Sequence, residues 1–433
     1  MTRITLIILS ITILSTTLWA QHINCGYDHA IEHMEQKYPG YKKSINKTFQ
    51  DAKNHSTPLR SSSMVYNIPV VVHVVWNEEE EMLDDSLILS QIEILNEDFR
   101  RLNSDAENIR DIFSSVVADP MIQFTLEEVI YVKTNALFEV DIFTNELPDN
   151  VKFDDTGGSD AWDNKSYLNI WICKIQPILF AGQTLGQLLG YAYPPNDLNN
   201  WPPEAAIPDP DFDGVVLDYR TVGRDNPYDI DPGTGEVLQF TKGRSAVHEV
   251  GHYLGLRHIW GDGDPFLPNS CNFDDGIADT PNAGAQTLFI CDTLQNTCSS
   301  TIDDLPDMIE NFMDYSSEDC QNSFTIGQIE LMRSVLENQR CQLIQLLDCS
   351  VSTSQLEFVD IDIYPNPSTG LFELRSANLD VNKFDFEIID ISGATYPVHM
   401  HTQTLDLSQF TPGIYIFRGT NEKQIFQQKL IRL

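Results

Sequence analysis

Positive charge is scarce in this chain of 433 residues, in which 27 Lys and Arg residues stand against 64 Asp and Glu residues. The formal charge of -37 leaves little to neutralise a run of phosphates, so the composition argues against a nucleic-acid partner and an anionic membrane surface. Long apolar runs are also scarce, and none after residue 20 is long enough to span a bilayer. A hydrophobic fraction of 42% is ordinary for globular proteins, and the length suggests two to three structural units.

The N-terminus has the pattern of a secretory signal peptide at residues 1–20. Arg3 gives a short basic start, residues 4–14 are mostly apolar, and small residues precede a cleavage site after Ala20. The alternative, a membrane anchor, is disfavoured because the apolar run is short for a span. Export makes disulfides permissible, which matters for a chain with eight cysteines.

The next segment, residues 21–64, is polar and rich in His, Lys, Asn and Ser. It contains a helical stretch at residues 28–38 and ends in a breaker-rich run at residues 56–63, which predicts an exposed linker and a site of proteolysis. Cys25 is its only cysteine, whereas six of the eight lie between Cys271 and Cys349. We interpret this segment as a propeptide.

Residues 65–349 read as one mixed α/β domain. The run at residues 67–76 is apolar on both faces, as in a buried central strand, and it contains His73, which we interpret as a core residue. Apolar residues at helical spacing predict a long amphipathic helix at residues 83–103. Further patterns predict strands at residues 122–132, 168–175 and 214–219, a loop-rich region at 262–320 and a helix at 325–347.

The C-terminal residues, 350–433, differ in character. A Ser-rich linker at residues 350–355 is followed by six short alternating strand patterns with Pro and Gly turns between them. This pattern predicts a small all-β sandwich.

A run of eleven residues, HEVGHYLGLRH at residues 248–258, carries the strongest chemical signal. His248 and His252 share one face of a helix and can hold one Zn²⁺, while Glu249 projects beside them to handle a proton. His258 cannot lie on the same straight helix face, so the chain must turn, and Gly255 allows that turn. Three protein ligands leave one position open for water, as in catalytic zinc sites. A helix of satisfied buried histidines would need neither Gly255 nor Glu249.

The run NFMDY at residues 311–315 fits a methionine turn beneath the metal. Met313 would pack below the imidazoles as an apolar floor. Tyr315 would stand near the metal, where its hydroxyl could stabilise an oxyanion. The alternative is that both residues only fill a loop core, but the zinc motif upstream favours the methionine turn.

These motifs, together with DDGIADTP at residues 274–281 and NFMDYSSEDCQNSFTIGQ at residues 311–328, resemble the pappalysin family of metzincins, in its cytophagalysin and ulilysin-like branch. The resemblance covers roughly residues 65–345 and implies a secreted zinc endopeptidase. It also implies an α+β metzincin catalytic domain, with a twisted mixed sheet, a long helix and the zinc helix above an irregular, disulfide-bonded lower subdomain.

For the lower subdomain, the resemblance implies two disulfides, Cys271–Cys298 and Cys291–Cys320, among the three pairings that four cysteines allow. Cys341 and Cys349 could form a small local bridge. The family also favours Ca²⁺ at Asp275 and Thr280, which offer hard oxygen ligands, over a solvated acidic loop.

Asp319 resembles the acidic floor of the pocket that receives the residue just after the scissile bond. A buried carboxylate there would favour Arg or Lys in the substrate. Residues 168–173 would form an edge strand that binds the extended substrate by strand addition.

Cys25 precedes Gly26 in an otherwise cysteine-free segment, and zymogens of related families block zinc with one propeptide thiolate. A thiolate is an excellent zinc ligand and would displace the catalytic water, so Cys25 is expected to bind zinc in the latent form. The alternative is a disulfide to Cys173. Activation would cut near Arg60.

The C-terminal sandwich resembles the type A sorting domain of the type IX secretion pathway. The matching runs are IYPNPSTG at residues 363–370, IDISG at residues 389–393 and GIY at residues 413–415. The resemblance implies export across the inner and outer membranes and a partner in the type IX machinery. The alternative is a small carbohydrate- or protein-binding sandwich, because a sandwich fold alone implies no function.

The combined prediction is a monomeric, secreted zinc endopeptidase made as a zymogen, with Glu249 as general base and proteins or peptides as substrates. The alternative from another class is a secreted zinc-bearing adhesin or binding module without turnover. Glu249 argues against it, because a structural zinc site needs no carboxylate next to its first ligand.

Overall fold

The three-dimensional structure is a computed structural model. The residues that it describes are 25–59, 64–180, 183–197, 200–201, 210–231, 237–261, 270–299, 305–345, 357–358, 362–375, 384–390, 395–398, 400, 403–420 and 424–433. The expected signal peptide, the expected cleavage near Arg60, and Cys349 lie outside these ranges. The chain divides into two compact units between Cys349 and Ser350, where the sequence places a linker.

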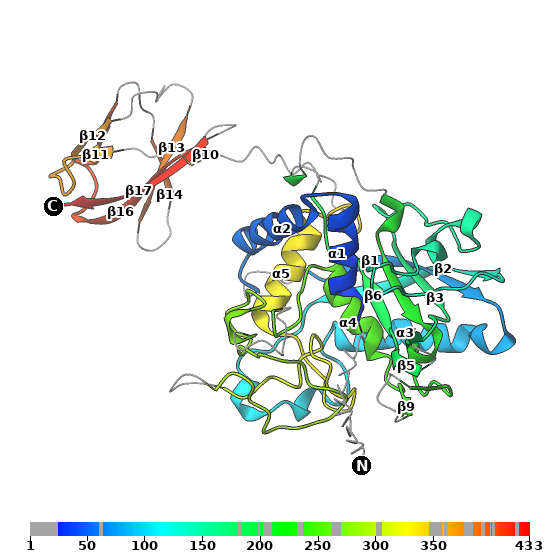
Figure 1. Cartoon of the computed structure of the whole chain (residues 1–433). Helices are drawn as coiled ribbons and strands as arrows, with labels where there is room; N and C mark the ends of the chain where they lie inside the picture. The colour runs from blue at the N-terminus through cyan, green and yellow to red at the C-terminus, as the bar shows by residue number, and fades with distance from the viewer. Residues whose placement is uncertain are drawn as a thin grey trace, which may run out of the picture. The chain divides into compact units, whose positions relative to one another are not determined.

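A five-stranded sheet organises the first unit, and β1, β2, β3 and β6 of this sheet are labelled in Figure 1. The strands have the order β2-β1-β3-β7-β6. Four strands are parallel, and the short β6 pairs antiparallel with β7 at one edge. The strands are β1 (Tyr66–Trp76), β2 (Ile122–Lys133), β3 (Leu168–Cys173), β6 (Gly190–Ala192) and β7 (Val215–Asp218). β1 is buried on both faces, as its apolar run predicts.

The two faces of the sheet enter different hydrophobic cores. Val70, Val72 and Val74 point to the first core, which also receives α3 (Asp85–Asp98), α4 (Arg244–Tyr253) and α5 (Ile326–Glu337). Val75 and Trp171 point to the second core on the opposite face. This alternation follows from the two-residue period of a strand.

The N-terminal segment, residues 25–59, contains two helices, α1 (Tyr27–Lys37) and α2 (Tyr41–His55). The helix expected at residues 28–38 is confirmed, whereas α2 was not predicted. α2 lies beside α5 (Figure 1). Phe49 of α2 belongs to the first core and Met34 of α1 to the second, so this segment is packed into the unit.

The lower part of the first unit is irregular, as the sequence indicates. Among its described residues, 270–299 and 305–325, the only regular element is a short 3-10 helix at Ser270–Asn272. Two disulfides, Cys271–Cys298 and Cys291–Cys320, hold it together, in the pairing that the resemblance implied. Cys341 is also disulfide-bonded. Two short hairpins complete the unit: β4 (Ile178–Phe180) with β5 (Gln183–Gly186), and β8 (Asp229–Ile230) with β9 (Leu238–Gln239).

The second unit is an all-β sandwich. One sheet has the order β10-β17-β16-β13-β14 and the other β11-β12-β15, and buried residues from both sheets form one core. The strands are β10 (Glu357–Phe358), β11 (Asp362–Tyr364), β12 (Leu371–Arg375), β13 (Asp385–Asp390), β14 (Thr395–Val398), β15 (Thr404–Asp406), β16 (Gly413–Thr420) and β17 (Gln424–Arg432). In neither unit do the described residues include a helix with the length and apolarity of a bilayer span.

Candidate zinc site and its surroundings

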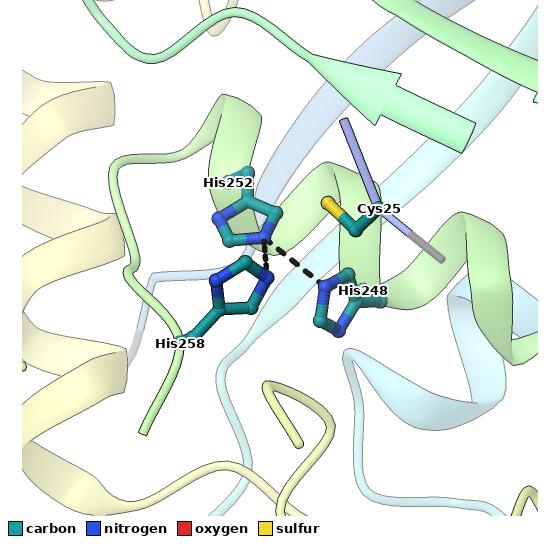
Figure 2. A group of neighbouring side chains, drawn as sticks. All are labelled: Cys25, His248, His252 and His258. Carbon is teal, nitrogen blue, oxygen red and sulfur yellow. Dashed lines mark hydrogen bonds between the residues drawn. The ribbon is translucent and has the colours of Figure 1, made fainter. Parts of the chain in front are cut away.

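The first two histidines of the motif lie on α4, one helical turn apart. The Nδ1 atom of His248 lies 2.7 Å from the carbonyl oxygen of Phe312, and that of His252 lies 2.9 Å from the carbonyl oxygen of Leu256. These contacts fix the rings so that the two Nε2 atoms face each other at 3.1 Å (Figure 2). An acceptor on Nδ1 orients a metal-binding imidazole and leaves Nε2 free for the ion.

The third histidine reaches the same point through a sharp turn. Gly255 has a φ of +96°, a left-handed conformation that suits glycine, and the helix ends there. The Nε2 atom of His258 then lies 3.1 Å from that of His252, so the three predicted ligands come together (Figure 2). The role that the sequence assigned to Gly255 is confirmed.

Burial sets the charge of these imidazoles. Burial, with repulsion from His258, lowers the pKa of His248 to about 3, and burial lowers the pKa of His258 to about 4. The pKa of His252 also falls well below its ordinary value, because of burial and of both neighbouring rings. All three are therefore neutral at pH 7, which is the form that binds a metal.

Glu249 is buried beside the first ligand and faces the edge strand β6. A Cβ atom on Gly190 would lie 2.9 Å from the Val216 carbonyl oxygen and 3.0 Å from the Glu249 Cγ atom, so glycine suits this position. Burial raises the pKa of Glu249 to about 8, although a hydrogen bond from Cys25 acts in the opposite direction. A carboxyl group in this environment can exchange a proton near neutral pH.

Cys25 completes the cluster from the N-terminal segment. Ligand atoms of Cys25, His248, His252 and His258 all lie within 4.8 Å of one another. Figure 2 shows that the Cys25 sulfur points toward the three imidazoles. Three imidazoles and a thiolate are a donor set that suits tetrahedral Zn²⁺, so the residues fit this metal.

Cys25 and Cys173 are both free, which excludes the alternative disulfide between them. Cys25 Sγ donates instead to Glu249 Oε2 at 3.4 Å, and the ring of Tyr27 stacks on His252 with centroids 4.0 Å apart. Burial, followed by the Glu249 charge, raises the pKa of the Cys25 thiol. The N-terminal segment thus contacts Glu249, the general-base candidate, through Cys25, and the His252 imidazole through Tyr27.

The expectation of an edge strand at residues 168–173 is wrong. These residues form β3, which lies between β1 and β7 in the interior of the sheet. The edge next to Glu249 is β6, whose outer side pairs with the N-terminal segment: Gly26 N donates to Gly190 O at 2.9 Å. Strand order has no local signal in the sequence, and the three-residue β6 gives almost no periodic pattern.

The structure places Met313 against α4 and Tyr315 beside the third histidine. Met313 is fully buried. Its Sδ atom packs closely against α4, since a Cβ atom on Gly251 would fall well within 3.0 Å of it. The Tyr315 hydroxyl lies 3.1 Å from His258 Nε2. Trp260, which the sequence reasoning did not consider, stacks on His258 and contacts Tyr315. The one feature of the sequence that could have indicated this contact is that Trp260 follows the third histidine by two residues.

Asp319 differs from the expectation of a buried carboxylate. Its side chain is 80% exposed and pairs with Lys242 at 3.1 Å. The neighbouring Glu318 is partly buried, and its two carboxylate oxygens accept N–H groups from Thr241, Lys242 and Arg244 at 2.8–3.0 Å. Glu318 faces inward because it holds the start of α4, and this leaves Asp319 directed outward.

Asp275 and Thr280 lie side by side in the acidic loop. The Thr280 hydroxyl is 2.9 Å from Asp275 Oδ1 and 2.9 Å from the carbonyl oxygen of Ile277. Asp279 contributes a buried Oδ1 atom without a hydrogen-bond partner. The oxygens are therefore of the right kind for Ca²⁺. His73, by contrast, is satisfied in the core by Ser159 and Asn169, as its interpretation as a core residue requires.

Comparisons with known proteins agree with this geometry. The family model described as pregnancy-associated plasma protein-A matches residues 235–337, and the one described as a secretion system C-terminal sorting domain matches residues 362–432. An extracellular metalloprotease of Arthroderma benhamiae is 27% identical over 293 residues, which are 66% of this chain and 84% of that protein.

Two solved structures from Tannerella forsythia are similar to this chain. A mutant of promirolysin is 34% identical with a TM-score of 0.59, over 75% of this chain and 98% of that one. Mature mirolysin in complex with a cleaved peptide is 36% identical with a TM-score of 0.52, over 66% of this chain and 97% of that one. The chain therefore belongs to the pappalysin family of secreted zinc metalloendopeptidases and ends in a sorting domain of the type IX secretion system.

Proposed function

We propose that the chain is the latent precursor of a zinc endopeptidase, in which residues 21–64 act as a propeptide and Cys25 occupies the position that catalysis needs open. The observation that carries this proposal is the buried group of one sulfur and three imidazole nitrogens within 4.8 Å. Zinc would stabilise the thiolate of Cys25 against the burial that otherwise raises its pKa. The match to promirolysin, which extends further along this chain than the match to mature mirolysin, also supports it.

In the active form, Glu249 acts as general base. Zinc held by the three histidines would acidify a water molecule and polarise the carbonyl group of the bond to be cut. Glu249 accepts a proton from the water and later delivers it to the leaving amine. Its burial beside the first ligand, and its contact with the Cys25 thiol, support this role.

Tyr315 and β6 supply the remaining groups. The Tyr315 hydroxyl, next to His258, donates to the oxygen of the carbonyl group as negative charge develops on it. The outer edge of β6 binds the extended substrate by strand addition once the N-terminal segment has left it. Latency therefore blocks both the metal and the substrate strand.

The test of latency compares two buried free thiols. Cys25→Ala in the full chain should cleave casein without the lag of the unprocessed wild type, because nothing fills the fourth position. Cys173→Ala, which removes a thiol far from the motif in the sequence, should keep the lag. The proposal fails if Cys25→Ala is as latent as the wild type while it retains its zinc.

The test of the general base uses Glu249→Gln, which keeps the shape of the side chain. Cleavage should fall by about 100-fold or more, with zinc still bound at one ion per chain. The same experiment decides against a non-catalytic zinc-bearing adhesin, for which the substitution would change nothing measurable in the cleavage assay.

A preference for Arg or Lys after the scissile bond is a finer proposal and depends on Asp319. Its exposed carboxylate lies in the loop that follows the methionine turn, and an incoming basic residue would have to replace its partner Lys242. A peptide library should show enrichment of Arg and Lys at that position, and Asp319→Asn should abolish it. No basic preference in the wild type would remove the proposal.

We also propose one structural Ca²⁺ at Asp275 and Thr280, supported by their clustered oxygens and by the unpartnered Asp279 oxygen. Calcium should raise the unfolding temperature of the wild type, and Asp275→Asn should remove that shift. Equal melting temperatures with calcium and with a chelator would contradict this site.

A further inference from the structure

A buried indole ring lies against the third histidine of the site. The ring of Trp260 is parallel to that of His258, with centroids 4.3 Å apart and planes inclined by 6°. Trp260 is only 5% exposed. The same indole meets the ring of Tyr315 edge-on, at 4.8 Å and 72°. One side chain thus contacts both a zinc ligand and the residue proposed to stabilise the oxyanion.

The backbone around Trp260 is fixed on both sides. Ile259 N donates to Met313 O at 3.4 Å, and Gly261 N donates to His258 O at 2.9 Å. Gly261 has a φ of +64°, and a Cβ atom there would collide with the backbone of Asp274. The backbone of this turn therefore has little freedom, which fixes the position from which the buried indole reaches His258.

His258 differs from the other two ligands in where it lies. His248 and His252 are part of α4, whose regular backbone sets their positions, whereas His258 stands on a loop after the helix has ended. A ligand on a loop needs more support from its surroundings to hold its orientation. The flat indole supplies that support over the whole face of the imidazole.

Tyr315 closes a triangle with these two rings. Its hydroxyl contacts His258 Nε2 at 3.1 Å, and its ring meets His258 at 5.1 Å and Trp260 at 4.8 Å. Loss of the Trp260 ring would therefore remove a packing contact from both His258 and Tyr315.

We propose that Trp260 is a positioning residue: it holds the His258 imidazole in its metal-binding orientation and keeps Tyr315 beside it. It acts through these two residues, whose rings contact its own. Residues that orient metal ligands typically change metal affinity or activity by about 10–100-fold when they are replaced. The effect of Trp260 should appear in zinc retention and in kcat, because His258 and Tyr315 serve these two quantities. KM should change little, because β6 and its backbone groups are untouched.

The experiment compares Trp260 with a matched indole elsewhere in the chain. Trp171 is also buried and also stacks on a histidine, His73, at 5.1 Å, but that histidine is bonded to Ser159 and Asn169 in the core. Trp260→Leu and Trp171→Leu remove the two stacks, and the two Trp→Phe variants keep a flat ring at each place. The full chain, loaded with zinc, is used throughout.

The first readout is the rate at which zinc passes to an excess of chelator. Trp260→Leu should release zinc about 10-fold faster or more than the wild type, and Trp260→Phe should restore most of the retention. Trp171→Leu should lower the unfolding temperature and leave the rate of zinc release unchanged. The second readout is the visible absorption of the cobalt-substituted protein, which should shift in Trp260→Leu and remain as in the wild type in Trp171→Leu.

The third readout is the split between kcat and KM on a peptide substrate after activation, where Trp260→Leu should lower kcat about 10-fold or more at nearly constant KM. The inference is overturned if Trp260→Leu lowers the unfolding temperature but keeps zinc release, the cobalt spectrum and kcat at wild-type values. It is equally overturned if Trp260→Phe is as impaired as Trp260→Leu, because a flat ring would then not be the relevant property.

Discussion

The packing of Met313 against Gly251 makes a prediction in which the sign of the effect is informative. Gly251 lies inside α4, where replacement by alanine ordinarily stabilises a helix by about 1 kcal/mol. Here a Cβ atom would overlap the Met313 Sδ atom, and because Met313 is fully buried its side chain could shift only into other core residues. Overpacking of this kind costs about 1–3 kcal/mol. The expected net result of Gly251→Ala is a loss of up to about 2 kcal/mol.

A double-mutant cycle separates the two contributions. Met313→Ala alone should cost about 2–5 kcal/mol, because it opens a cavity beneath the zinc helix. In that background the new methyl group meets no sulfur, so Gly251→Ala should stabilise by about 1 kcal/mol. Gly251→Ala should therefore destabilise the wild type but stabilise the Met313→Ala variant. The interaction energy between the two sites should be about 2 kcal/mol.

Tryptophan fluorescence during urea unfolding of the zinc-loaded full chain provides the assay. All six tryptophans precede residue 350, so the signal reports only the first unit. The reasoning is refuted if Gly251→Ala stabilises the wild type by about 1 kcal/mol, the value for an unobstructed helix position. Strict additivity of the two substitutions would refute it as well.

Three further predictions concern other parts of the first unit. Burial raises the pKa of Asp314 from 3.8 to about 7. Its contribution to stability is therefore fully present below pH 3.8 and is lost as the pH rises through 7. Urea unfolding should show that the free energy of unfolding falls by up to about 4 kcal/mol over that range, and Asp314→Asn should remove this pH dependence. Glu318→Gln should cost about 1–3 kcal/mol, because a charged acceptor of three N–H groups at the start of α4 is lost, whereas Asp319→Asn should leave the unfolding midpoint unchanged. Phe49 of α2 packs on Arg257 at 3.9 Å and lies in the first core, so we expect α2 to anchor the N-terminal segment on the unit. Phe49→Ala should weaken this anchor and let the precursor cleave casein before processing. Lys47→Ala at an exposed position is the control, and equal latency in both variants would contradict this expectation.

Local chemistry explains why much of the site could be predicted. Helical spacing places His248 and His252 together, and a glycine marks the turn that brings His258 to them. These are properties of a few consecutive residues, and the sequence contains them completely. The sandwich and the central strand β1 were predictable for the same reason, because their alternating or continuous apolar patterns are local.

Features that depend on distant packing were missed or misplaced. The helix α2 was overlooked because its exposed lysines dominate its composition, although Ile45, Phe49 and Ala52 recur at helical spacing. Adjacent acids cannot be told apart by sequence, and only the contact of Glu318 with the start of α4 decides which of Glu318 and Asp319 turns inward. Strand order has no local signal either, so the edge was assigned to β3 instead of β6.

The N-terminal segment contributes to both cores of the first unit, with Phe49 and Ala52 in one, and with Ala30, Met34, Tyr41 and Ile45 in the other. If the segment is removed on activation, as proposed above, the trimmed enzyme must keep the same sheet without these six buried side chains. We expect the trimmed enzyme to persist through a slow unfolding rate and not through a large equilibrium stability. Once denatured, the trimmed enzyme should aggregate unless the missing segment is supplied. The segment would then be needed for folding but not for keeping the folded state.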